Sequence, residues 1–191
     1  MQSIAQTRRV ATAVVLVSAL FALTLSTPVS AQLAPPDRNA VIFRVATFGN
    51  PVYTAGFSWA FNPQFDIAGS YNFTANAPTG NMWDAGVRYH FRLPTSGVDA
   101  YVGAGVANVS APFMGFANGS GFTGGGGGSV RFNELLTGYG SVNIVSVGGT
   151  TNSVLDLGVE LNFGTRASGQ LGYINFGGVG EPYLGVSFAL H

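Results

Sequence analysis

The chain has 191 residues, a formal net charge of zero, no cysteine and only 8% charged residues, against about 25% in ordinary soluble domains. The missing cysteines exclude a disulfide framework and a thiolate metal site, and the balanced charge leaves no basic footprint for nucleic acid. All eight basic residues are arginines, so the five glycines at 124–128 lack the lysine that a P-loop requires.

The N-terminal 31 residues have the features of an export signal. Arg8 and Arg9 precede the apolar stretch VATAVVLVSALFALTL, and VSA at 29–31 fits a signal-peptidase site. Because about sixteen apolar residues are short for a membrane-spanning helix of roughly 20, we predict a cleaved signal peptide at 1–31 rather than an anchor. Residues 32–39 then form a short lead-in, and 40–191 suffice for one domain.

Three later segments alternate strictly between large apolar residues and small or polar ones, which is the pattern of a β-strand. In 53–61 one face carries Tyr53, Ala55, Phe57, Trp59 and Phe61, and the same alternation occurs in 82–91 and 154–163. No helical period fits these segments. Further candidate strands lie at 41–48, 65–73, 98–109, 135–147 and 167–176.

A repeat links the ends of alternate strands. The segments 55–61, 85–91, 126–132, 157–163 and 184–190 each have glycine second, an apolar residue fifth and a large apolar residue last. Their spacing is that of a β-hairpin repeat. The pentaglycine therefore lies within a strand, and the glycines point to a crowded inner wall. These repeat glycines are Gly56, Gly86, Gly127, Gly158 and Gly185.

Together these segments give ten strands, so we predict an all-β fold, an antiparallel up-and-down transmembrane β-barrel, with eight strands if the first hairpin is not embedded. Short links follow the repeated ends, and longer ones such as 74–81 lie on the opposite side, as in outer-membrane barrels. Large apolar residues near the short-turn end would form an aromatic girdle in lipid. These residues are Trp59, Phe61, Tyr89, Phe91, Phe132 and Phe163. A soluble sandwich or lipocalin-like barrel is the alternative, but its other face would need more charge than this chain supplies.

The pattern resembles the small outer-membrane β-barrels of diderm bacteria, namely the OmpA-type transmembrane domain and the opacity-type porin-like proteins. The resemblance rests on the signal peptide, the repeated strand ends and the glycine-rich strands, over roughly residues 40–190. It implies an outer-membrane location and lipid, including lipopolysaccharide, as the partner. One departure is the end of the chain: the family commonly ends in phenylalanine, whereas this chain ends VSFALH, with His191 added after Leu190.

The inward face carries the polar chemistry. Four arginines and five carboxylates nearly balance, which predicts a paired network in a filled lumen and no ring of one sign. A narrow permeation path for small solutes is the alternative. The predicted lumen network consists of Arg44, Asp66, Asp84, Arg88, His90, Arg92, Asp99, Arg131, Asp156 and Glu160.

Catalysis and partner binding are two further hypotheses. Some small outer-membrane barrels modify lipid A or cleave proteins, and His90 with Asp84, Asp156 or Ser153 would be the candidate site. No fixed spacing singles these residues out, so we predict a non-catalytic protein that contributes to envelope structure and takes no cofactor or metal. The loop 110–121 carries Phe113, Met114 and Phe116 and is a candidate contact for an envelope or host surface.

Overall fold

The computed structural model describes residues 39–46, 51–75, 80–93, 98–111, 113–164 and 166–190. The predicted signal peptide, most of the lead-in and His191 lie outside these residues, so signal cleavage and the effect of the added histidine stay predictions. Within the described part, no helix is long and apolar enough to cross a membrane.

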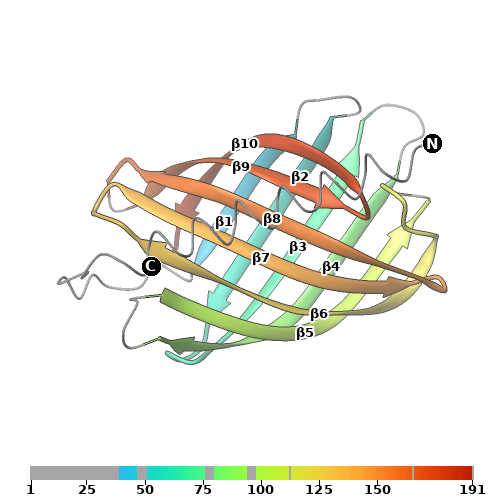
Figure 1. The fold of residues 1–191 in the computed structure, drawn as a ribbon, viewed down its shortest axis with the longest axis horizontal. Coiled ribbons are helices and arrows are strands. Elements are labelled where there is room, and N and C mark those ends of the chain that lie inside the picture. Colours follow the sequence, from blue (N-terminus) through green and yellow to red (C-terminus); the bar gives the residue numbers. More distant parts are fainter. Residues whose placement is uncertain are drawn as a thin grey trace, which may run out of the picture.

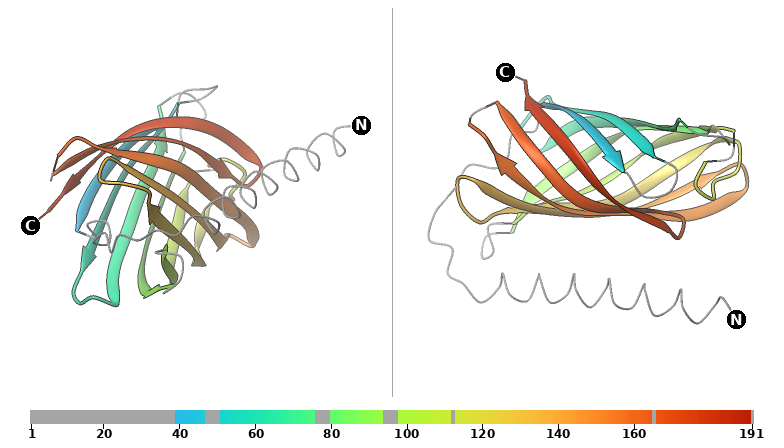
Figure 2. Two further views of the ribbon diagram at one scale, coloured as in Figure 1. Left: turned by 60° about the vertical axis from the view of Figure 1, so that its left-hand side comes forward. Right: turned by 90° about the horizontal axis from the view of Figure 1, so that it is seen from above.

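The chain forms one closed antiparallel barrel in which each strand pairs with its neighbours in sequence and β1 pairs with β10. The ten-strand prediction is therefore confirmed, and the eight-strand alternative is wrong because the first hairpin belongs to the barrel. The strands cross the long axis obliquely (Figure 1) and wrap around a common interior (Figure 2). They are β1 (Ala40–Ala46), β2 (Val52–Ala60), β3 (Phe65–Thr74), β4 (Asn81–Arg92), β5 (Val98–Ser110), β6 (Gly119–Arg131), β7 (Leu136–Val147), β8 (Thr150–Asn162), β9 (Ala167–Phe176) and β10 (Val179–Ala189).

We call the end of the barrel that holds Asn39 and Leu190 the base, and the opposite end the mouth. Two of the mouth connections are two-residue turns, Gly148-Gly149 and Gly177-Gly178, and all four glycines have positive φ. That conformation is cheap only for glycine and matches the twist of the flanking strands. The mouth also carries the longer connection 111–118, between β5 and β6.

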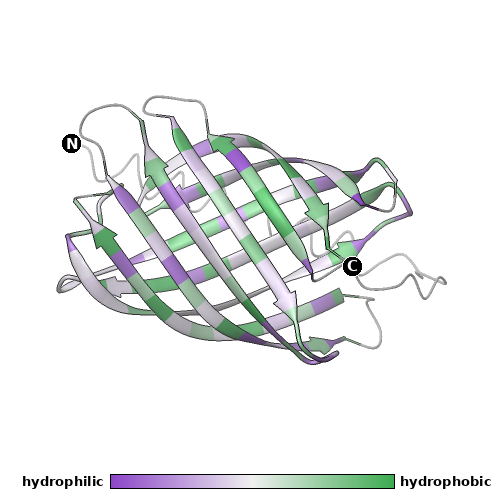
Figure 3. Ribbon diagram, turned by 180° about the vertical axis from the view of Figure 1, so that it is seen from behind, coloured by the Kyte–Doolittle hydropathy of each residue, from purple (hydrophilic) through white to green (hydrophobic). Residues whose placement is uncertain are grey.

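Large apolar side chains point outward along every strand, as the period-two pattern predicts. Figure 3 shows the resulting alternation of hydrophobic and hydrophilic residues along the strands. The six predicted girdle residues are all exposed on this surface, with Phe61 and Phe163 the most open. Such a continuous exposed apolar surface is costly in water and suits a lipid environment.

The repeat glycines lie on the inward face, where three of them make room for large side chains. The Tyr139 hydroxyl stands where a Cβ on Gly158 would be, the Arg44 stem covers Gly185, and the Tyr101 hydroxyl lies over Gly127. The pentaglycine is inside β6, as predicted. Because these glycines have no Cβ, the interior side chains can pack directly against the backbone of the barrel wall.

Candidate functional site

The first interior cluster surrounds Arg44 of β1. Its Nη1 donates to Asp156 Oδ2 at 2.6 Å, and its Nε donates to Gln170 Oε1 at 2.8 Å. The guanidinium lies over the rings of Tyr183 and Tyr139, 4.8 and 5.6 Å from their centroids. The Tyr183 hydroxyl donates to Asp156 Oδ1 at 2.7 Å. The cluster therefore joins β1 to strands near the end of the chain, and the guanidinium of Arg44 and the carboxylate of Asp156 are both hydrogen-bonded.

The second cluster is centred on Asp66, which is fully buried. Arg88 donates to it through Nε and Nη2, both at 2.8 Å, in the bidentate geometry that arginine favours. His90 Nε2 lies 2.9 Å from Asp66 Oδ2, the oxygen that also accepts from Arg88 Nη2, and His90 Nδ1 is 3.5 Å from Asp99 Oδ1. Arg88 also covers the Tyr101 ring at 5.0 Å. Asp66 is therefore shared by two basic side chains near the base.

A third group follows β2, β3 and β4 and consists of hydrogen bonds aimed at one carboxylate. Thr54 Oγ1 donates to Asn72 Oδ1 at 2.7 Å, Asn72 Nδ2 donates to Ser70 Oγ at 3.0 Å, and Ser70 Oγ donates to Asp84 Oδ1. The donors run in one direction and end on Asp84. This carboxylate makes no ion pair with any described residue.

Of the three other predicted network residues, Glu160 is joined to the first cluster through Gln170. Glu160 accepts hydrogen bonds from Ser168 and from Gln170 Nε2. Arg131 is partly buried at the end of β6, near the base. Arg92 has the inward phase and stands opposite Asp99 in register, but it is exposed because β4 ends there. The alternation predicts which face of the strand Arg92 occupies. It does not predict how far along the barrel axis the residue lies, because that position depends on the tilt of the strands.

The connection 111–118, which we call the plug, buries two aromatic side chains in the mouth of the barrel. Phe113 and Phe116 are each 1% exposed and hydrogen-bond to each other through their backbones. Phe113 packs edge-on against Phe176, with 5.4 Å between ring centroids. Asn152 Nδ2 donates to the Gly115 carbonyl at 2.9 Å and fastens the plug to β8. Phe113 and Phe116 are thus buried rather than exposed, and a partner contact through loop 110–121 stays a prediction.

Beneath the plug, apolar side chains fill the inward face of the mouth. They include Met82, Ala107, Val109, Val145, Val154 and Ile174, which form one buried cluster with the plug aromatics. The apolar side chains thus gather at the mouth, although the buried Glu181 and Thr74 also lie at this end of the barrel. The alternation could not foresee this distribution, because it separates only the two faces of each strand.

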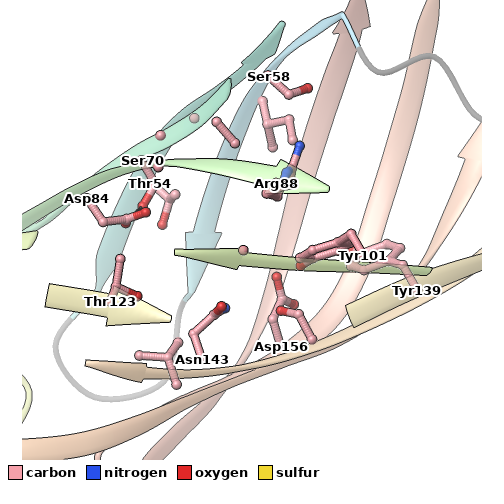
Figure 4. Close-up of a pocket in the computed structure, with 18 of the residues that line it drawn as sticks. Thr54, Ser58, Ser70, Asp84, Arg88, Tyr101, Thr123, Tyr139, Asn143 and Asp156 are labelled. Carbon is pink, nitrogen blue, oxygen red and sulfur yellow. Dashed lines mark hydrogen bonds between the residues drawn. The ribbon is translucent and has the colours of Figure 1, made fainter. Parts of the chain in front are cut away.

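A cavity of about 370 Å³ lies in the lumen between the polar groups and the apolar mouth. Figure 4 shows Asp84, Ser70 and Thr54 grouped along its lining, together with Thr123 and Asn143 from β6 and β7. Arg44, Arg88, His90 and Asp156 also border it. The lumen therefore holds a chamber of the size that small-molecule sites have.

Sequence reasoning missed several interior residues, among them Tyr139, Gln170, Glu181 and Tyr183. Phase alone would have found Glu181 and Tyr183, which lie four and two residues before the repeat glycine Gly185 on the same face of β10. Glu181 and Tyr183 are both buried. Glu181 adds a sixth carboxylate to the five that were predicted.

The catalytic alternative finds little support in this geometry. His90 is bound to Asp66 and close to Asp99, while Asp84 and Asp156 belong to other groups. Over the described ranges, no three His, Asp or Glu side chains are arranged to hold a metal ion.

The chain matches no protein-family model and no curated protein. Among solved structures it is similar to a de novo designed transmembrane β-barrel, at 12% identity and a TM-score of 0.50, covering 83% of this chain and 98% of that one. It is similar to the KdgM porin at 10% identity and a TM-score of 0.51, covering 80% and 99%. The N-terminal barrel domain of Pseudomonas aeruginosa OprF aligns at 17% identity and a TM-score of 0.39, covering 80% and 98%. At these identities the similarity shows the barrel fold alone.

Proposed function

We propose that this protein is an integral outer-membrane β-barrel with a closed, non-catalytic lumen, and that it contributes to envelope structure. The observation that carries the proposal is the burial of Phe113 and Phe116 in the mouth, within one apolar cluster. The apolar outward face supports a place in lipid, and the export signal predicted at 1–31 supports a place in the outer membrane.

The interior supports a structural role because its ionic groups bind one another. Arg44 is held by Asp156 and Gln170, and Arg88 is held by Asp66. An open pore of this strand number would need a continuous wet path, whereas apolar constrictions oppose water and ions. The plug supplies such a constriction at the mouth.

Location is tested by fractionating cells that express the full chain, followed by electrophoresis with and without boiling. Recovery in the outer membrane with a heat-dependent shift in mobility is the expected result. Recovery in the soluble periplasmic fraction without a shift would contradict the membrane proposal. The lipid A of the same cells should be unchanged by expression, and any new acylation pattern would contradict the non-catalytic proposal.

Closure is tested by conductance in planar lipid bilayers. The unmodified protein should give no discrete steps, while the variant with Phe113→Ala and Phe116→Ala should give openings, because the apolar closure is removed. Protease protection of both proteins in vesicles controls for insertion. Stable steps from the unmodified protein would contradict the closed lumen.

A narrow channel for small solutes is the second candidate. The cavity of about 370 Å³ favours it, because it already provides a polar volume over part of the lumen. In this case the plug would act as a gate, and the same conductance experiment separates the two functions.

A further inference from the structure

The lumen cavity has an unusual charge environment, because interior carboxylates outnumber interior arginines. The arginines are Arg44, Arg88 and Arg131, and the carboxylates are Asp66, Asp84, Asp99, Asp156, Glu160 and Glu181. Of these groups, four carboxylates line the cavity itself, against Arg44, Arg88 and His90. A low-dielectric wall focuses such a field into the cavity, so a cationic guest is favoured over an anionic one.

Two carboxylates, Asp84 and Glu160, border the cavity without an ion pair to a described residue. Glu160 accepts a hydrogen bond on each oxygen, whereas Asp84 accepts on Oδ1 alone. Arg88 acts on it electrostatically, but the guanidinium of Arg88 is bound to Asp66 through both nitrogens. Asp84 Oδ1 accepts from Ser70, and Oδ2 accepts no hydrogen bond from any residue that the structure describes. A charged group with an open acceptor beside a cavity is where a cationic donor binds most strongly.

Two further polar side chains border the cavity with their hydrogen-bonding groups unused by the protein. Thr123 and Asn143 make no side-chain hydrogen bond to another described residue. A primary ammonium carries three donors, and carboxylate, hydroxyl and amide oxygens are acceptors for them. A quaternary ammonium would instead need free aromatic faces, but Tyr101 and Tyr139 already lie under arginines.

The apolar part of the cavity begins next to Asp84. Met82 is two residues along β4 on the same face, and Ala107 stands opposite Asp84 in register. Beyond them Val145, Ile174 and Phe176 line the cavity toward the mouth. An alkyl chain attached to the ammonium would be shielded from water there.

We infer that the lumen cavity is a binding site for a small primary alkylammonium, with the ammonium at Asp84 and the alkyl chain against the apolar wall below the plug. The inference does not depend on whether the barrel conducts ions. It also does not depend on the location of the barrel in the cell, because binding is measured on the purified protein.

The experiment is calorimetric titration of the purified full-length barrel in detergent micelles with three probes of equal chain length, hexylammonium, hexan-1-ol and hexanoate. Hexylammonium should bind saturably and more tightly than hexan-1-ol, and hexanoate should not bind. From propylammonium upward, each methylene should raise the affinity about fourfold until the cavity is full. Tetramethylammonium should bind more weakly than a primary ammonium.

The matched variants are Asp84→Asn and Glu160→Gln, which each remove one negative charge from the cavity wall. Asp84→Asn should weaken hexylammonium binding about 10- to 150-fold, the effect of one charge-assisted hydrogen bond. Glu160→Gln should weaken it far less, because Glu160 is already engaged by Ser168 and Gln170. Retention of the heat-dependent mobility shift shows that each variant is folded.

Several outcomes would overturn the inference. Equal losses in the two variants would mean a diffuse negative field rather than a site at Asp84. Equal binding of hexylammonium and hexan-1-ol would mean apolar partitioning, and the absence of saturable binding would mean a cavity occupied by water alone. If Asp84→Asn fails to fold, the comparison of the three probes on the unmodified protein decides the question.

Discussion

The contact between Arg44 and Asp156 provides the sharpest test of the interior network. The two charged atoms are 2.6 Å apart, and the side chains are 14% and 16% exposed. Replacing Arg44 by methionine keeps much of the apolar stem but leaves Asp156 with the Tyr183 hydroxyl and no cation. Removing one partner of a buried pair costs about 3–5 kcal/mol, and the residual exposure places this case near 3 kcal/mol.

A double-mutant cycle separates the pair from its surroundings. Arg44→Met, Asp156→Asn and the double variant should show a coupling of about 1.5–3 kcal/mol, the strength of a hydrogen bond to a charged group. The double variant should therefore be more stable than the sum of the single losses indicates, because it leaves no unpaired charge in the lumen.

The assay is urea unfolding in detergent micelles, followed by tryptophan fluorescence. Trp59 and Trp83 are both exposed on the outward face, so they report the loss of the barrel without contacting the pair. Arg166→Met is the matched control, since Arg166 is exposed in a base turn, and it should change stability by less than about 0.5 kcal/mol. A coupling below about 0.5 kcal/mol would refute the reasoning, because independent sites add to within that value.

Two further predictions concern the wall and the plug. Gly158→Ala should destabilise the barrel by about 1–3 kcal/mol, because the new methyl group meets the Tyr139 hydroxyl. Gly124→Ala is the control and should be neutral or stabilising, because a Cβ at this position makes only an ordinary contact. Equal losses of stability in urea unfolding would contradict this account. Asn152→Ala should lower the hydrogen-exchange protection of the Phe116 amide about 2- to 13-fold, the effect of one lost hydrogen bond of 0.5–1.5 kcal/mol. Thr151→Ala, which loses only a bond to Ser146, should leave that amide unchanged, and equal effects would mean that the plug is not fastened through Asn152.

The strands and their faces were predictable because the period of two is local. The inward phase of Asp66, Asp84 and Arg88 followed from their immediate neighbours, and the closed barrel followed from the number of such strands. Gly127 shows the strength of the repeat, since the pentaglycine alone resembles a linker, yet its alignment with the other strand ends placed it inside β6.

The partners of each interior group were not predictable, because they depend on tilt and register around the whole barrel. Arg44 and Asp156 are 112 positions apart, and no local pattern relates them. Tyrosine is also ambiguous: Tyr89 faces outward, while Tyr183 is buried inside. The plug carries no period, so its phenylalanines gave no sign of pointing inward.

The position of Arg44 bears on the order of events during folding. The residue lies on β1, which has seven residues and is the shortest strand, while its partners Tyr139, Asp156, Gln170 and Tyr183 come from the last four strands. None of these contacts is close to Arg44 along the chain, so they become available when β1 reaches β10. The cluster therefore stabilises the barrel when β1 pairs with β10. A sheet in which these two strands are not yet paired lacks this stabilisation.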